Sequence, residues 1–97
     1  MSTELAIDYL RMKAPSLHEA MAEHCERLAT VIELGTISEY PTVADYLEAD
    51  AARLTGLMHS AILNEIPFPE GLTVTGVSDA LTVIYTASRI SSLAKAA

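Results

Sequence analysis

Prolines and glycines divide this 97-residue sequence into four stretches, and this division constrains the fold more than any other feature. The breaks fall at Pro15, at the segment from Gly35 to Pro41, and across the segment from Pro67 to Gly76. Between the breaks, apolar residues recur every three or four positions, which is the periodicity of an amphipathic helix. The sequence therefore predicts an all-α fold: a compact bundle of one short N-terminal helix and three longer helices.

We expect the helices at about residues 3–13, 16–34, 42–64 and 78–95, and together they form a single domain over residues 1–97. Residues 16–19 have the pattern of a capping box, in which two side chains satisfy the free amides at a helix start. Residues 42–45 are a weaker version of the same pattern. Ser78 is the expected N-cap of the last helix, after an extended connection over residues 72–75.

A short turn joins the second and third helices, so we expect them to form an antiparallel hairpin. At a rise of about 1.5 Å per residue, His24 and Asp50 then lie at the same height. Each residue interrupts the row of apolar residues that runs along one face of its helix, which we call the apolar seam of that helix. This predicts a polar pair that sets the register of the two helices at some cost in stability. The alternative is that both side chains point to solvent.

The last helix is apolar around more than half of its circumference. Such a helix is either central to its domain or shared with a partner, and a short chain has little material to surround it. We therefore expect a homodimer that associates through Val83, Ile84, Ala87, Ile90 and Leu93. The alternative is that the first helix covers this surface and the chain stays monomeric.

Acidic residues are concentrated in the first half of the chain, which has a net charge of −7, whereas residues 51–97 have a net charge of zero. Direct binding to nucleic acid is disfavoured, because the chain has few lysine and arginine side chains to neutralise phosphates. The pattern predicts an acidic surface for a larger, basic partner protein. Its residues are Glu19, Glu23, Glu26, Glu33, Asp45 and Glu48. The alternative is that these acids serve solubility alone.

The sequence holds no pattern typical of catalysis or of cofactor binding. His18 and His24 are six residues apart, whereas a zinc-binding helix needs a spacing of four, so we expect no metal. Cys25 has acidic neighbours that oppose formation of a thiolate, which favours a structural thiol. The scattered glycines make no phosphate-binding loop. We therefore expect a protein that is not an enzyme and carries no cofactor.

Ile66 and Phe68 lie in a proline-containing loop that we expect to present an apolar anchor to a partner. The alternative is that Phe68 folds back over the end of the bundle. The leading function is a non-catalytic interaction module, such as an adaptor, antiactivator or inhibitor, that binds a larger protein. One alternative is an acidic mimic of nucleic acid that inhibits a nucleic-acid-binding protein, as a phage-encoded inhibitor of host defence would. Another is a helical bundle that binds a small molecule.

The expected location is the cytoplasm of a bacterium or of a cell infected by a phage. The first residues lack the basic and apolar segments of a signal peptide. No apolar run reaches the roughly 18 residues of a membrane span, so we expect no membrane association. A single cysteine suits a reducing compartment.

Overall fold

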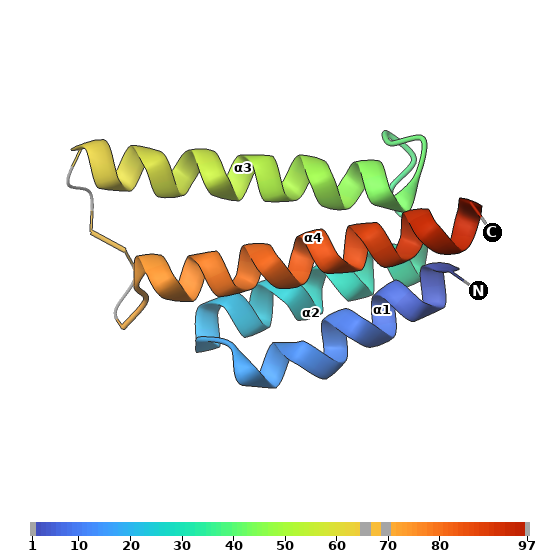
Figure 1. The fold of residues 1–97 in the computed structure, drawn as a ribbon, viewed down its shortest axis with the longest axis horizontal. Coiled ribbons are helices and arrows are strands. Elements are labelled where there is room, and N and C mark those ends of the chain that lie inside the picture. The colour runs from blue at the N-terminus through green and yellow to red at the C-terminus, as the bar shows by residue number, and fades with distance from the viewer. Residues whose placement is uncertain (1, 65–66, 69–70, 97) are drawn as a thin grey trace.

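The computed structural model describes residues 2–64, 67–68 and 71–96. These residues form α1 (Ser2–Lys13), a short 3₁₀ helix η1 (Ala14–Ser16), α2 (Glu19–Leu34), α3 (Val43–Asn64) and α4 (Val74–Ala96). They contain no strand, so the prediction of an all-α bundle is confirmed. The bundle is elongated and measures 42 × 24 × 22 Å (Figure 1).

Helix α4 is the central element of the bundle. α3 packs along one side of it and α1 along another, and α1 in turn packs against α2 (Figure 1). α2 and α3 run antiparallel, as expected, but they approach each other less closely than the other sequential neighbours do. The main core draws on all four helices, and Leu10, Leu28, Leu47 and Ile84 are among its buried residues. The apolar surface of α4 is thus largely covered within one chain.

The second helix starts later than expected because Ser16 is used elsewhere. The Ser16 hydroxyl donates a hydrogen bond to the carbonyl oxygen of Lys13 at 2.7 Å. His18 caps α2 instead, and its Nδ1 accepts a hydrogen bond from the backbone amide of Ala20 at 3.1 Å. The predicted start at residue 16, with a capping box over residues 16–19, is therefore wrong.

The last helix begins at Val74, four residues before the expected start at Ser78. Thr73 is the residue that begins it, because its hydroxyl oxygen accepts a hydrogen bond from the amide of Gly76 at 3.1 Å. Its carbonyl oxygen also accepts from the amide of Val77 at 3.0 Å. The β-branched residues of this segment were expected to be extended. A threonine is also a good N-cap, however, and Thr73 caps α4 here.

At one end of the bundle, the last turns of α3 and the first turns of α4 extend beyond α1 and most of α2 (Figure 1). We call this part, residues 57–64 and 74–81, the two-helix end. Its buried cluster is small and consists of Met21, Leu72, Val77 and Ala80. The bundle is therefore well filled along most of its length and sparsely filled here.

Candidate functional site

An apolar recess of about 280 Å³ opens at the two-helix end. It is lined by Met21 of α2, by Leu54, Leu57, Met58 and Ala61 of α3, by Pro67, Phe68 and Leu72 of the α3–α4 connection, and by Val77 of α4. None of these side chains is charged. Leu57 is 62% exposed at the rim, and Met58 and Phe68 are half-buried. The recess can therefore accept an apolar side chain from another molecule.

The recess exists because the apolar seam of α3 continues past the start of α2. Leu54, Met58 and Ala61 repeat at helical spacing along this seam. At this level α2 contributes Met21 from its first turn, and the remaining cover comes from the α3–α4 connection. Here the seam of α3 faces a loop and not a packed helix. Part of its apolar surface therefore stays uncovered.

Phe68 folds back onto the bundle and packs against the small cluster that contains Met21 and Val77. The expectation of a free, exposed anchor is therefore wrong for Phe68, because its ring covers the otherwise open end of the core. Ile66, the other residue of the predicted anchor, lies outside the described residues.

The structure brings His24 and Asp50 together between α2 and α3. His24 Nε2 lies 2.7 Å from Asp50 Oδ2, and Asp50 is only 4% exposed. The other carboxylate oxygen of Asp50 is 3.8 Å from an Nη atom of Arg53, one turn along α3. Because a buried carboxylate is costly without a partner, this contact holds the two helices in one register.

Cys25 is fully buried beside this pair. Burial raises the pKa of its thiol to about 11, and the negative charges of Asp50 and Glu26 act in the same direction. A thiol with such a high pKa carries almost no thiolate at neutral pH, and the thiolate is the nucleophilic form. Cys25 thus has the environment of a packing residue.

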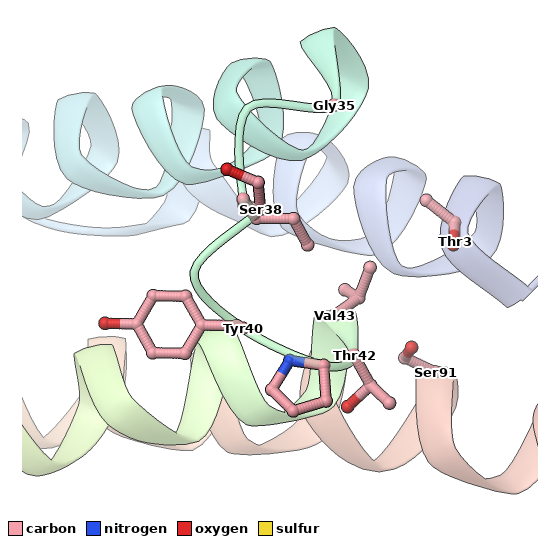
Figure 2. Close-up of a pocket in the computed structure, with 9 residues that line it drawn as sticks. Thr3, Gly35, Ser38, Tyr40, Thr42, Val43 and Ser91 are labelled. Atoms are coloured by element: carbon pink, nitrogen blue, oxygen red, sulfur yellow. The ribbon is translucent and has the colours of Figure 1, made fainter.

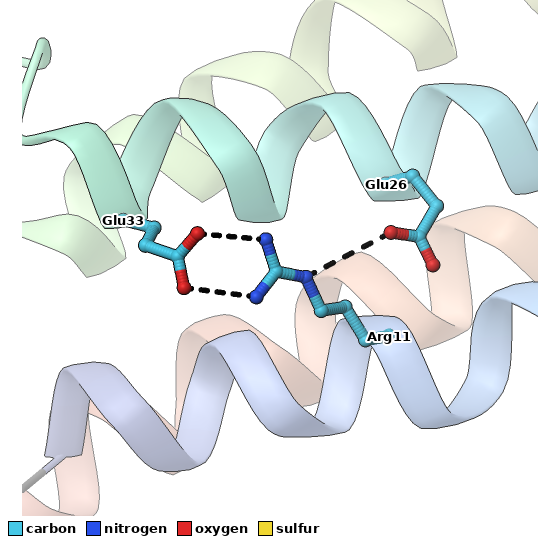
Figure 3. A network of polar contacts seen from close by, with 3 residues as sticks. All are labelled: Arg11, Glu26 and Glu33. Atoms are coloured by element: carbon cyan, nitrogen blue, oxygen red, sulfur yellow. Dashed lines mark hydrogen bonds and ion pairs between the residues drawn. The ribbon is translucent and has the colours of Figure 1, made fainter.

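Arg11 connects α1 to two of the acids on α2, as Figure 3 shows. Its two terminal nitrogens each lie 3.0 Å from a carboxylate oxygen of Glu33, and its Nε lies 3.8 Å from Glu26. The hydrogen bonds from Arg11 lower the pKa of Glu33. Glu26 and Glu33, expected to face a partner, are thus engaged within the chain.

The other four predicted acids differ in their surroundings. Glu19 and Glu23 are exposed on α2. Asp45 belongs to the cap of α3, where its amide donates to Thr42 Oγ1 at 3.1 Å and its carboxylate accepts from the Thr42 hydroxyl at 3.0 Å. Glu48 points to the α4 side, 3.4 Å from the Ser88 hydroxyl. Glu48 is thus directed towards α4, whereas Glu26 and Glu33 are directed towards α1.

The residues predicted for self-association lie mostly inside the chain. Val83, Ile84 and Ala87 are buried in the main core, so the prediction of a dimer surface at these three positions is wrong. The cause is that α1 covers α4, which was the alternative. Ile90 is half-buried and lines a shallow hollow against α1. The side chain of Leu93 lies outside the described part of the structure.

A second cavity, of about 440 Å³, lies at the opposite end of the bundle, between the start of α1, the α2–α3 loop and α4 (Figure 2). Its lining includes the hydroxyl-bearing residues Thr3, Ser38, Tyr40, Thr42 and Ser91, and no charged residue. In Figure 2 the side chains of Ser38 and Tyr40 point away from Thr3 and Ser91. The hydroxyl groups do not converge on one point, so this cavity has few of the features of a specific binding site.

In the described part of the chain, no three His, Cys, Asp or Glu side chains gather as a possible metal site. Within the same ranges, no helix combines the length and apolar character needed to cross a bilayer. Comparison with protein-family models, with curated proteins and with solved structures finds no match. The interpretation of function therefore depends on the geometry of the chain itself.

Sequence reasoning missed the recess, although one signal pointed to it. The apolar seam of α3 runs through Leu54 and Met58 to Ala61 and is flanked by Leu57, so it is longer than the facing seam of α2. A difference in seam length between packed helices indicates apolar surface without a cover at one end. The place where this uncovered surface lies depends on which helices pack together.

Proposed function

We propose that the protein is a non-catalytic interaction module, of the adaptor or inhibitor type, that binds other protein chains through its apolar recess. The observation that carries this proposal is an uncharged recess with Leu57 exposed at its rim, at the end where α3 and α4 are covered by the first turn of α2 and by a loop. The centres of protein interfaces are depleted in charge. Much of the binding energy there comes from side chains that fill pockets.

The expected mode of binding is a helix laid across the recess. Such a helix would cover Leu57 and insert an apolar side chain next to Met58 and Phe68. The site of action that suits the single buried thiol is the cytoplasm, where thiols stay reduced. A nucleic-acid mimic has less support, because Arg11 engages Glu26 and Glu33 and Glu48 is directed towards α4.

Leu57→Asp tests the proposal, because it places a charge at the rim of the recess without disturbing the core. Leu34→Asp is the matched control: Leu34 is 69% exposed and is the last residue of α2, whereas the recess is lined by Met21 in the first turn of that helix. Cross-linking in extracts of the source organism, followed by mass spectrometry, should identify proteins captured by the wild type and by Leu34→Asp but lost with Leu57→Asp. If capture survives Leu57→Asp but is lost on changing Glu19 and Glu23 to Lys, the acidic surface binds the partner and the proposal is wrong.

A further inference from the structure

The size of the apolar recess limits what it can hold. Its volume is about 280 Å³. An apolar cavity of about 150 Å³ inside a protein is large enough to bind benzene, whereas pockets for drug-sized ligands begin at about 300 Å³. The recess therefore has room for a molecule of one ring or of two fused rings, and a larger molecule would extend into solvent.

The lining of the recess favours an aromatic ring over a saturated one. Met21 and Met58 contribute thioether side chains to it, and Phe68 contributes its own ring. Met21 belongs to the small buried cluster at the two-helix end, and Met58 and Phe68 pack against that cluster. Both thioether sulfur atoms and aromatic rings make contacts with an aromatic ring that are more favourable than burial alone provides. Methionine side chains are also adaptable, so they can close around a ring.

The recess also favours an uncharged ligand. Its lining contains no Lys, Arg, His, Asp or Glu side chain, so no group there offsets the cost of removing an ionic group from water. The chain as a whole carries a net charge of −7, which disfavours an anion further. A small polar substituent can stay at the open side of the recess, next to the exposed Leu57.

We infer that the recess is a binding site for a small, uncharged aromatic molecule of one ring or two fused rings, held between Met21, Met58 and Phe68. This inference goes beyond the proposed function, because the ligand is a small molecule and not a protein chain. The two are independent, since the recess can hold a ring whether or not it also accepts a side chain from a partner.

Indole is the probe that tests the inference, and NMR of the methionine methyl groups follows its binding. The chain has four methionines, and Met12, which is exposed beside the shallow hollow on α1, serves as an internal control. We expect saturable binding with a Kd below about 1 mM. The methyl signals of Met21 and Met58 should shift, and that of Met12 should not. Because the chain contains no Trp, the fluorescence of bound indole can be measured directly.

Ala61→Leu should block the site, because Ala61 lines the recess and a larger side chain there fills the space. Ala52→Leu is the matched control, since Ala52 is exposed on the same helix and is not part of the lining. Indole should bind at least about tenfold more weakly to Ala61→Leu, and equally well to Ala52→Leu. Circular dichroism should show that both variants are folded.

A comparison of two probes tests the preference for an aromatic ring. Phenol and cyclohexanol are similar in size and carry the same hydroxyl group, but only phenol is aromatic. Phenol should bind at least about threefold more tightly than cyclohexanol. This comparison and the Met12 control use the wild-type chain, so both remain valid if Ala61→Leu fails to fold.

Three results would overturn the inference: no binding of indole up to its limit of solubility, equal shifts at Met12 and Met58, or equal affinities for phenol and cyclohexanol. A folded Ala61→Leu that binds indole as the wild type does would overturn it as well. The proposed function fails separately. If indole does not bind but Leu57→Asp abolishes capture of other proteins, only the ligand site is wrong. If indole binds but capture survives Leu57→Asp, only the proposed function is wrong.

Discussion

His24 Nε2 lies 2.7 Å from Asp50 Oδ2 and joins α2 to α3, two helices that approach each other less closely than α3 approaches α4. Asp50 is buried, and among the described residues its other close charge is Arg53 at 3.8 Å. Across this part of the bundle, a polar contact supplements the packing of apolar side chains.

Removal of His24 should therefore destabilise the fold. His24→Ala leaves Asp50 buried with only a distant partner, and we expect a loss of about 3 kcal/mol in the free energy of unfolding. In a double-mutant cycle with Asp50→Ala, measured by urea denaturation, the two changes should be coupled by about 1 kcal/mol or more. Additive effects would show that the contact does not link the helices energetically.

The stability of the protein should fall in alkaline solution because of Cys25. Burial raises the pKa of the thiol from 9.0 to about 11, so the folded chain keeps the proton over a range in which the unfolded chain has lost it. The contribution of the neutral thiol to stability is thus complete below pH 9 and is lost between pH 9 and about 11.

Thermal unfolding from neutral to alkaline pH measures this loss, and Cys25→Ala is its control. The variant should show a shallower decline than the wild type, although Tyr46, whose pKa is also raised by burial, contributes to both. A thiol reagent should label the folded wild type much more slowly than the unfolded chain. Equal labelling rates would contradict the buried environment of Cys25.

The Arg11–Glu33 contact should depend on both the shape of the side chain and the pH. Arg11→Lys retains the charge but loses the paired hydrogen bonds to the carboxylate, so it should lower the melting temperature at low salt. Because Arg11 lowers the pKa of Glu33, this contribution is present at neutral pH. It is lost as the pH falls below the ordinary value of 4.5 and the carboxylate takes up a proton.

A double-mutant cycle with Glu33→Gln tests this contact at neutral and at acidic pH. Coupling between the two positions should be measurable in the first condition, and absent in the second or at high salt. Coupling that persists in acid would mean that the effect does not come from the ionised carboxylate.

Gly56→Ala should stabilise the protein. Gly56 lies inside α3, and a Cβ atom added there meets no heavy atom within 4 Å, so the glycine faces solvent and does not serve a close approach of backbones. Alanine favours the helix by about 0.5–1 kcal/mol, which corresponds to a rise of about 3–6 °C in Tm. The same substitution at Gly35 should be destabilising, because its φ of 71° disfavours a side chain. Differential scanning calorimetry of both variants measures these two changes in Tm.

Several local features could be predicted from the sequence because they depend on neighbouring residues. The cap of α3 by Thr42 and Asp45, and the end of α2 at the left-handed Gly35, are where the pattern places them. The errors at the starts of α2 and α4 have a local cause as well. Ser16 and Thr73 both carry a hydroxyl group that can cap a helix. Periodicity alone does not show that Thr73 caps a helix and that Ser16 does not.

By itself, the sequence determined that the chain is a bundle of four helices, where they lie to within a few residues, and that His24 and Asp50 stand at the same height. The tertiary structure decided which helix covers which. That choice buried Val83, Ile84 and Ala87 under α1, placed Arg11 beside Glu33, and left the seam of α3 open next to Leu57. Periodicity shows which face of a helix is apolar. Because the hydrophobic effect is non-directional, any apolar face can pack against any other. The relative lengths and packing of all four helices select the arrangement, and they also set where the recess lies.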